Sequence, residues 1–336
     1  MLTKQKILEL PYVYTANVFS VGDRLCVGAG SERPHPSYLL DFENREPVEI
    51  APAPGGTMSL VPVPGSDHHL VSVMGLFPPF IGLEAGIFLH TKKDGAWSSR
   101  MVIALPFSHR CEFLTVEGAS HLLIGTCSKH KANPEDWKQA GEVYGVKVGD
   151  PDSCDWKPTL IMDNLYRNHG MTKSAIDGED CLCVSGTEGI FAIRPQATGS
   201  YAVTRLFDTE VSEFVFIDLD HDGVDELVTI ELFHGNTLNI YKKKDQTWER
   251  RYTSPLSFGH GLCAGTFKGE LVIVVGSRRD TLALELHKVV DFANGAIERI
   301  ILETGVGPTQ TRLFTHKGTD YILSANQVKN EVALYS

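Results

Sequence analysis

The sequence has no apolar run long enough to span a membrane, and its first residues lack the apolar core and cleavage site of a secretion signal. It also lacks an excess of positive charge, since 31 Lys and Arg residues stand against 42 Asp and Glu, a formal net charge of -11. Nucleic-acid binding requires clustered cations, so we expect no nucleic-acid partner. The seven cysteines form no compact framework of pairs, which favours buried free thiols in a reducing compartment. We therefore predict a cytoplasmic protein with no membrane partner.

The motifs of several large enzyme classes are missing as well. The sequence contains no serine elbow, no Gly-rich phosphate loop and no dinucleotide-binding fingerprint. A metal site built from cysteines is not expected either. Cys181 and Cys183 lie in one strand pattern, and we expect their thiols to face opposite ways.

The chain is instead built from a repeated unit. Six times a turn glycine follows the start of an apolar strand pattern by nine residues, at Gly22, Gly65, Gly118, Gly178, Gly269 and Gly318. A seventh copy replaces this turn with the acidic segment 218–223. Short runs rich in Val, Ile, Leu and Phe, separated by Gly, Asp, Asn and Pro, indicate strands. Seven such units predict an all-β fold, a seven-bladed β-propeller of four-stranded antiparallel blades, in a single domain covering residues 1–336.

The repeat also predicts where the blades begin and how the ring closes. We expect blades to start near residues 12, 56, 109, 169, 210, 260 and 309. Only six of the seven units contain a run that fits the fourth strand of a blade. Residues 4–10 should therefore supply the missing strand, complete the last blade and remove its open edge. Two long insertions, 75–85 and 128–141, should overhang the face on which the innermost strands begin. Within the second, residues 133–140 have the pattern of a helical turn.

Residues at the same place in each copy should form a ring at one mouth of a central channel. Four neighbouring copies contribute His109, His169, Glu210 and His260 at this place. Imidazoles with one carboxylate suit Zn²⁺, Mn²⁺, Fe²⁺ or Ni²⁺ and leave a position for water or substrate. We therefore predict a divalent transition metal in the channel, with Glu213 as the alternative to Glu210 if a bulge shifts the register.

Several other polar residues should lie on the same face. Arginine can bind a carboxylate with two hydrogen bonds, and Tyr and Lys can act as acid or base. The candidate catalytic residues are Arg110, Tyr166, Arg167, Lys173 and Arg312.

The acidic turn of the fifth unit has the spacing of a calcium loop. Carboxylates alternate at its positions one, three and five, a glycine follows at position six, and a backbone carbonyl and a further carboxylate come next. We predict Ca²⁺ bound by Asp218, Asp220, Asp222, Val224 and Glu226. Because this turn should lie at the end of the blade opposite the ring, its predicted role is structural.

The acidic turn resembles the DxDxDGxxDL calcium loop of FG-GAP (VCBS-like) propeller repeats. With the channel histidines, the chain also resembles aldos-2-ulose dehydratase and the propeller lyases that act on uronic-acid sugars. This resemblance implies a metal-dependent carbon–oxygen lyase, dehydratase or isomerase acting on a small sugar or sugar acid. In this chemistry, a metal and an arginine stabilise the charge that develops when a base removes a proton beside a carbonyl or carboxylate.

Two other functions stay open at this point. A propeller can be a non-catalytic module that binds a carbohydrate or protein, with calcium as a purely structural ion. A glycoside hydrolase with paired carboxylates is the second alternative, because Glu84, Glu112 and Glu213 could meet in the channel. The sequence leaves the substrate, the general base and the oligomeric state undetermined.

Overall fold

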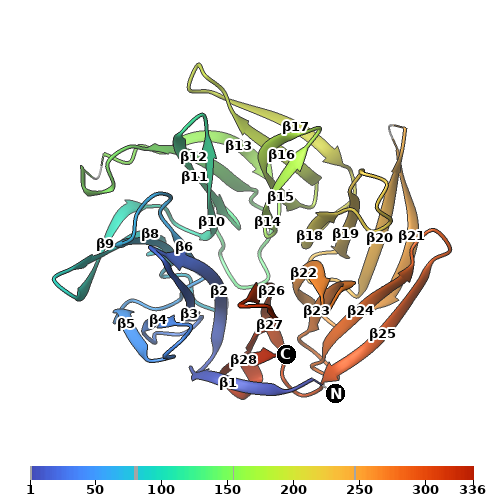
Figure 1. Cartoon of the computed structure of the whole chain (residues 1–336). Helices are drawn as coiled ribbons and strands as arrows, with labels where there is room; N and C mark the ends of the chain where they lie inside the picture. The colour runs from blue at the N-terminus through green and yellow to red at the C-terminus, as the bar shows by residue number, and fades with distance from the viewer. Residues whose placement is uncertain (1, 79–81, 154, 246) are drawn as a thin grey trace. The chain divides into compact units, whose positions relative to one another are not determined.

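The structure is a computed structural model that describes residues 2–78, 82–153, 155–245 and 247–336. Its described residues form 28 β-strands and two short 3-10 helices, with no α-helix among them. The strands form seven sheets of four strands each (Figure 1). Neighbouring strands in each sheet are antiparallel. The chain is a seven-bladed β-propeller, as the repeat predicts.

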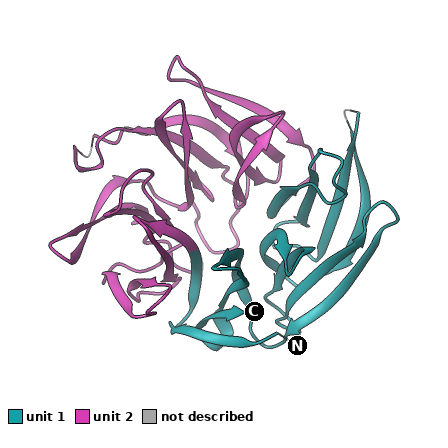
Figure 2. Ribbon diagram, in the orientation of Figure 1, with its two compact units in different colours: residues 1–17, 211–336 teal, residues 18–210 magenta. Residues whose placement is uncertain are grey.

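Two compact units make up the chain (Figure 2). Unit 1 comprises residues 1–17 and 211–336, and unit 2 comprises residues 18–210. Strand β2 begins in the first and ends in the second.

The first four blades have their strands in sequence order. The first contains β2 (Val13–Val21), β3 (Arg24–Ser31), β4 (Ser37–Asp41) and β5 (Pro47–Ala51). The second contains β6 (Ser59–Pro62), β7 (His69–Met74), β8 (Gly86–Lys93) and β9 (Ala96–Ala104). The third contains β10 (Ser108–Val116), β11 (Ala119–Thr126), β12 (Gly141–Val148) and β13 (Thr159–Leu165), with the 3-10 helix η1 (Pro151–Ser153) before its last strand. The fourth contains β14 (Met171–Ile176), β15 (Glu179–Gly186), β16 (Gly189–Pro195) and β17 (Tyr201–Phe207).

Unit 1 contains the other three sheets. The fifth blade has β18 (Glu213–Ile217), β19 (Glu226–Glu231), β20 (Thr237–Lys244) and β21 (Thr247–Pro255). The sixth has β22 (Gly259–Phe267), β23 (Glu270–Ser277), β24 (Leu284–Asp291) and β25 (Ala296–Glu303). The last has β26 (Pro308–His316), β27 (Thr319–Asn326), β28 (Glu331–Tyr335) and, as its fourth strand, β1 (Lys4–Glu9), with the 3-10 helix η2 (Gln327–Lys329) before β28.

The pairing of β1 with β28 is the arrangement predicted for the N-terminal strand. The two strands are antiparallel, with Lys4 opposite Tyr335 and Glu9 opposite Glu331. Beyond the ladder, the amide of Thr3 donates to the carbonyl of Ser336 at 2.9 Å. The first and last strands of the chain therefore share one sheet, and β28 is paired on both sides.

The repeated turn glycines have a common backbone conformation. All six have positive φ, between 60° at Gly22 and 81° at Gly269. In four of these turns the residue before the glycine also has positive φ, as in Glu117-Gly118 (50° and 76°). Two successive residues with positive φ form the type I′ turn, whose twist matches that of a β-hairpin. In these four turns the glycine therefore marks a tight hairpin between the first and second strands.

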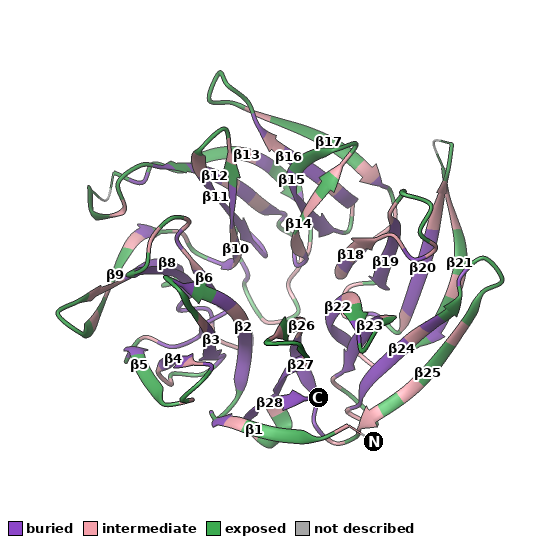
Figure 3. Cartoon of the chain, in the orientation of Figure 1, coloured by how far each residue is buried: buried purple, intermediate pink, exposed green. Residues whose placement is uncertain are grey.

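Burial follows strand position within the blades. All six residues of β7 are buried, whereas only one residue of β9, the outermost strand of the same blade, is buried. Figure 3 shows the outer strands β17, β21 and β25 mostly in the colours of exposed and intermediate residues. Core residues of adjacent blades in unit 2, such as Leu123 and Leu182, belong to one apolar cluster.

A buried histidine links strands inside the second blade. His90 of β8 is fully buried; its Nε2 lies 2.7 Å from Ser72 Oγ and its Nδ1 lies 2.6 Å from Ser99 Oγ. The Ser99 hydroxyl donates in turn to the carbonyl of Ile50, which lies in β5. Burial lowers the pKa of His90 to about 3, so this imidazole is neutral in the folded protein.

One local prediction is wrong. Residues 133–140 form no helix, although the amide of Asp136 bonds to the carbonyl of Asn133. The side chain of Asn133 accepts from the amide of Glu135, and that of Asp136 accepts from the amide of Lys138. Such local side-chain bonds compete with the hydrogen bonds of a helix. Residues 79–81 of the other insertion lie outside the described part of the chain.

Candidate functional site

In unit 2 the structure brings two of the predicted ligands together. His109 lies in β10 and His169 lies two residues before β14. Their ring centroids are 4.7 Å apart, and each residue is at most 3% exposed. Both therefore lie at the start of an innermost strand, as the repeat predicts.

In unit 1 the third predicted histidine is held in one orientation. His260 of β22 is fully buried, and its Nδ1 lies 2.6 Å from the carbonyl oxygen of Thr309. A carbonyl only accepts, so Nδ1 carries the proton and donates it to this oxygen. Nε2 is then the accepting nitrogen, and the hydroxyl of Tyr14 lies 3.3 Å from it. A histidine fixed in this way at one nitrogen can offer the other to a metal.

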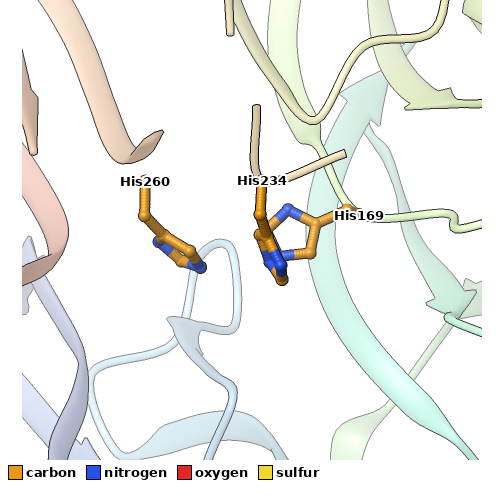
Figure 4. Close-up of side chains that lie close together, drawn as sticks. All are labelled: His169, His234 and His260. Carbon is orange, nitrogen blue, oxygen red and sulfur yellow. The ribbon is translucent and has the colours of Figure 1, made fainter. Parts of the chain in front are cut away.

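A further histidine beside His260 was not predicted from the sequence. His234 lies between β19 and β20, and its ring is stacked on that of His260 with centroids 5.4 Å apart. Phe233 and Phe258 pack against the same ring at 4.1 and 4.5 Å. Figure 4 shows the imidazoles of His234 and His260 in unit 1 and also draws His169 of unit 2.

His234 falls outside the repeat column because it belongs to the connection between a second and a third strand. Such connections lie at the same end of the blade as the beginning of the innermost strand. The sequence signal that could have indicated His234 is a histidine beside a glycine in this connection, as in Phe233-His234-Gly235.

The predicted carboxylate ligand has a different partner. Glu210 Oε1 lies 2.8 Å from a guanidinium nitrogen of Arg167, and the Glu210 side chain is 15% exposed. Both residues lie in unit 2. A carboxylate that accepts from an arginine is partly neutralised, which makes it a weaker candidate for a metal ligand than the histidines. Its proposed alternative, Glu213, begins β18 and is half-buried.

The other candidate catalytic residues are spread over both units. Lys173 pairs with Glu112 at 3.1 Å in unit 2, and Arg312 donates to Asn17 at 3.0 Å in unit 1. Arg110 is half-buried in β10. Tyr166 is 38% exposed, and its backbone amide donates to Glu188.

Tyr14 is a residue that the sequence reasoning missed. It is 1% exposed in β2, its hydroxyl lies 3.3 Å from Nε2 of His260, and the guanidinium of Arg278 lies 6.0 Å from its ring centroid. A tyrosine in an apolar strand pattern gives no sequence signal of its own, because core tyrosines share that pattern.

The acidic turn of the fifth blade gathers its carboxylates around a lysine. Carboxylate oxygens of Asp218, Asp220 and Glu226 lie within 4.8 Å of one another. Lys242 of β20 donates from Nζ to Asp220, Asp222 and Glu226 at 2.6, 2.7 and 2.9 Å. Burial opposes the charge of this ammonium, but the three carboxylates outweigh it and raise the pKa of Lys242. Bound Ca²⁺ stays a prediction, and Lys242 supplies positive charge to the same carboxylates.

The turn is further ordered by its own backbone. Asp218 accepts from the amides of Asp222 and Gly223 at 3.2 and 3.0 Å. Glu226, whose side chain is fully buried, accepts from the amide of Leu219 at 2.6 Å. Val224 is 46% exposed, and its amide donates to Asp222.

The expectation for the two strand cysteines is wrong. The sulfur atoms of Cys181 and Cys183 lie 3.6 Å apart in β15, and both residues are fully buried. Successive side chains of a strand alternate, so residues two apart share a face. Their hydrogen bond lowers the pKa of Cys181 and raises that of Cys183.

Comparison with known proteins identifies the fold. No protein-family model and no curated protein matches the sequence. The structure is similar to the crystal structure of the Cps50 (Swd1) β-propeller domain of Myceliophteria thermophila, with 11% identity and a TM-score of 0.65 over 99% of both chains. It is also similar to the Dos1 propeller, with 11% identity and a TM-score of 0.57, covering 96% of this chain and 78% of that one. At this identity the likeness shows a shared β-propeller fold alone.

A search of the described residues for a helix long and apolar enough to cross a membrane finds none.

Proposed function

We propose that the protein is a metal-dependent carbon–oxygen lyase, dehydratase or isomerase that acts on a small sugar or sugar acid. The proposed ligands of the metal in unit 1 are His234 and His260 (Figure 4). The observation that carries the proposal is the buried His260, whose Nδ1 donates to a carbonyl, so that its accepting Nε2, 3.3 Å from the Tyr14 hydroxyl, is the nitrogen that can bind an ion. His234 stacked beside it supplies a second imidazole from the same unit.

This ligand set suits Zn²⁺, Mn²⁺, Fe²⁺ or Ni²⁺. Neutral imidazole is a ligand for all of these metals, and two imidazole ligands leave coordination positions open for water or substrate.

The residues around His260 fit proton transfer beside a carboxylate or carbonyl. A bound divalent ion would polarise the oxygen next to the C–H bond that breaks. The hydroxyl of Tyr14 is placed to exchange a proton with the substrate, because it lies 3.3 Å from the nitrogen that faces the proposed ion. The guanidinium of Arg278 near the Tyr14 ring fits the carboxylate of a sugar acid.

Metal analysis of purified protein tests the site itself. We expect one equivalent of a transition metal to be lost in His234→Ala and in His260→Ala and kept in the control His35→Ala. His35 is a half-buried histidine in unit 2 outside the proposed ligand set. Full retention of the ion in both site variants would overturn the proposed ligands.

Deuterium exchange tests the chemistry without requiring the true substrate to turn over. The metal-loaded protein is incubated in D₂O with small ketoses and uronic acids, and NMR follows deuterium incorporation beside the carbonyl or carboxylate. We expect incorporation by the wild type and at least about a 100-fold loss in Tyr14→Phe, the scale of general acid–base catalysis. A protein that binds the ion and the sugars but exchanges no proton is a non-catalytic binding module, and the enzyme proposal then fails.

A further inference from the structure

A second cluster of potential ligands lies within unit 2 and shares no residue with the predicted channel ligands. His68, His69 and Asp152 each offer one ligand atom, and these atoms lie within 4.8 Å of one another. His68 directly precedes β7, His69 is the first residue of β7, and the aspartate comes from η1, between β12 and β13. They line a cleft of about 250 Å³ between these segments.

We propose that this cleft binds a divalent metal ion of the zinc class through His68, His69 and Asp152. His69 is 3% exposed, and its Nε2 lies 3.2 Å from Asp152 Oδ1. Two ligand atoms bonded at about 2.0 Å in a tetrahedral site lie about 3.3 Å apart. The nitrogen and the oxygen are therefore already at the spacing that a tetrahedral ion requires.

Hydrogen bonds orient both imidazoles for this role. Nδ1 of His69 lies 2.9 Å from the hydroxyl of Ser66, which leaves Nε2 to face Asp152. Nδ1 of His68 lies 2.6 Å from Asp67 Oδ1, which leaves Nε2 of His68 as its ligand atom. A histidine held by a carboxylate at one nitrogen and by a metal at the other is a recurrent arrangement in zinc sites.

The third ligand needs only a small side-chain movement. The side chain of His68 is 48% exposed, and its ring lies beside that of His69 with centroids 4.2 Å apart. A rotation of this exposed ring would bring its nitrogen to bonding distance without moving the backbone. Three protein ligands leave a fourth position, which would open into the cleft toward water.

Charge in the cleft also favours a cation. Asp150 lines it beside Asp152 and accepts from the amide of Asp152 at 3.0 Å. The two carboxylates would neutralise the charge of a divalent ion, to which the two imidazoles would bind as neutral ligands. Binding would tie the turn of the second blade to the last connection of the third.

Titration of the full-length protein with Co²⁺ alone tests the site, because visible absorption reports on tetrahedral coordination. We expect His68→Ala and Asp152→Asn each to bind one equivalent of Co²⁺ less than the wild type, or to bind that equivalent at least about 10-fold more weakly. The control His35→Ala should behave as the wild type. Asp152 is 63% exposed, so its substitution should leave the fold intact. Wild-type stoichiometry and affinity in both variants would overturn the proposal.

Two further variants separate this site from the other proposed metal and from general damage to the fold. His260→Ala should keep the equivalent bound in the cleft, because His260 contributes nothing to it. Asp67→Asn should lower the affinity of the cleft for Co²⁺ by about 10- to 100-fold without changing the number of sites, since Asp67 orients a ligand but does not bind the ion. An unchanged affinity in Asp67→Asn would remove the orienting role of that carboxylate.

Discussion

Lys242 stands out at the residue scale because one ammonium satisfies three carboxylates of the acidic turn. Removing it would leave the fully buried carboxylate of Glu226 without its cation. We expect Lys242→Met to lower the free energy of unfolding by about 3 kcal/mol, the lower end for breaking a buried pair, because Asp222 is partly exposed. Millimolar Ca²⁺ should restore much of this loss in the variant. Urea unfolding with and without Ca²⁺ measures both effects.

The matched control is Lys244→Met in the same strand. Lys244 is 65% exposed and pairs with Glu249 at 3.2 Å, so its removal should cost less than about 1 kcal/mol. If the wild type gains as much stability from Ca²⁺ as Lys242→Met does, the lysine does not take the place of the ion.

His90 makes stability depend on pH. Its pKa is about 3 in the folded protein against an ordinary value of 6.5, because burial disfavours the charged ring. Between these values the unfolded chain binds a proton that the folded chain does not. The contribution of neutral His90 to the free energy of unfolding is therefore complete above about pH 6.5. It falls by about 1.4 kcal/mol per pH unit as the pH drops toward 3. Unfolding measured from pH 7 to 5 should show a shallower decline in His90→Gln than in the wild type, and parallel curves would contradict this assignment.

At the scale of elements, β1 protects the last strand of the chain. It covers β28, buries Leu8 and places Lys4 against Glu303 and Glu331. Deleting residues 1–9 should cost at least about 2 kcal/mol from the burial of Leu8 alone. Deletion would also expose the edge of β28, and an unpaired strand edge should promote self-association.

Size-exclusion chromatography with light scattering and thermal unfolding measure these two effects. Lys6→Ala is the control on the same strand, because the side chain of Lys6 is 50% exposed and its removal should change stability by less than about 1 kcal/mol. A deletion variant that stays monomeric with the wild-type melting temperature would show that β1 is dispensable.

At the scale of the whole molecule, the two proposed metal sites should add independently to stability. An ion that binds only the folded chain stabilises it by about 2.7 kcal/mol at 100 times its dissociation constant. Sites without shared residues contribute additively. Zn²⁺ should therefore raise the melting temperature of His260→Ala and of Asp152→Asn by less than that of the wild type. The double variant should gain almost nothing, and an undiminished shift there would place the bound zinc elsewhere.

The sequence by itself determined the propeller, because its repeat is encoded locally. Each turn glycine needs a positive φ, each strand needs its apolar run, and the missing fourth strand has one candidate in residues 4–10. The column of His109, His169 and His260 follows from the same register.

Only the tertiary structure decided which side chains meet. His234 and Tyr14 come from parts of the chain that no repeat column links to His260, and Lys242 lies 16 residues beyond Glu226. His69 and Asp152 are 83 residues apart. Such contacts depend on how neighbouring strands and blades pack, and local patterns of apolar residues and turns carry no information about them.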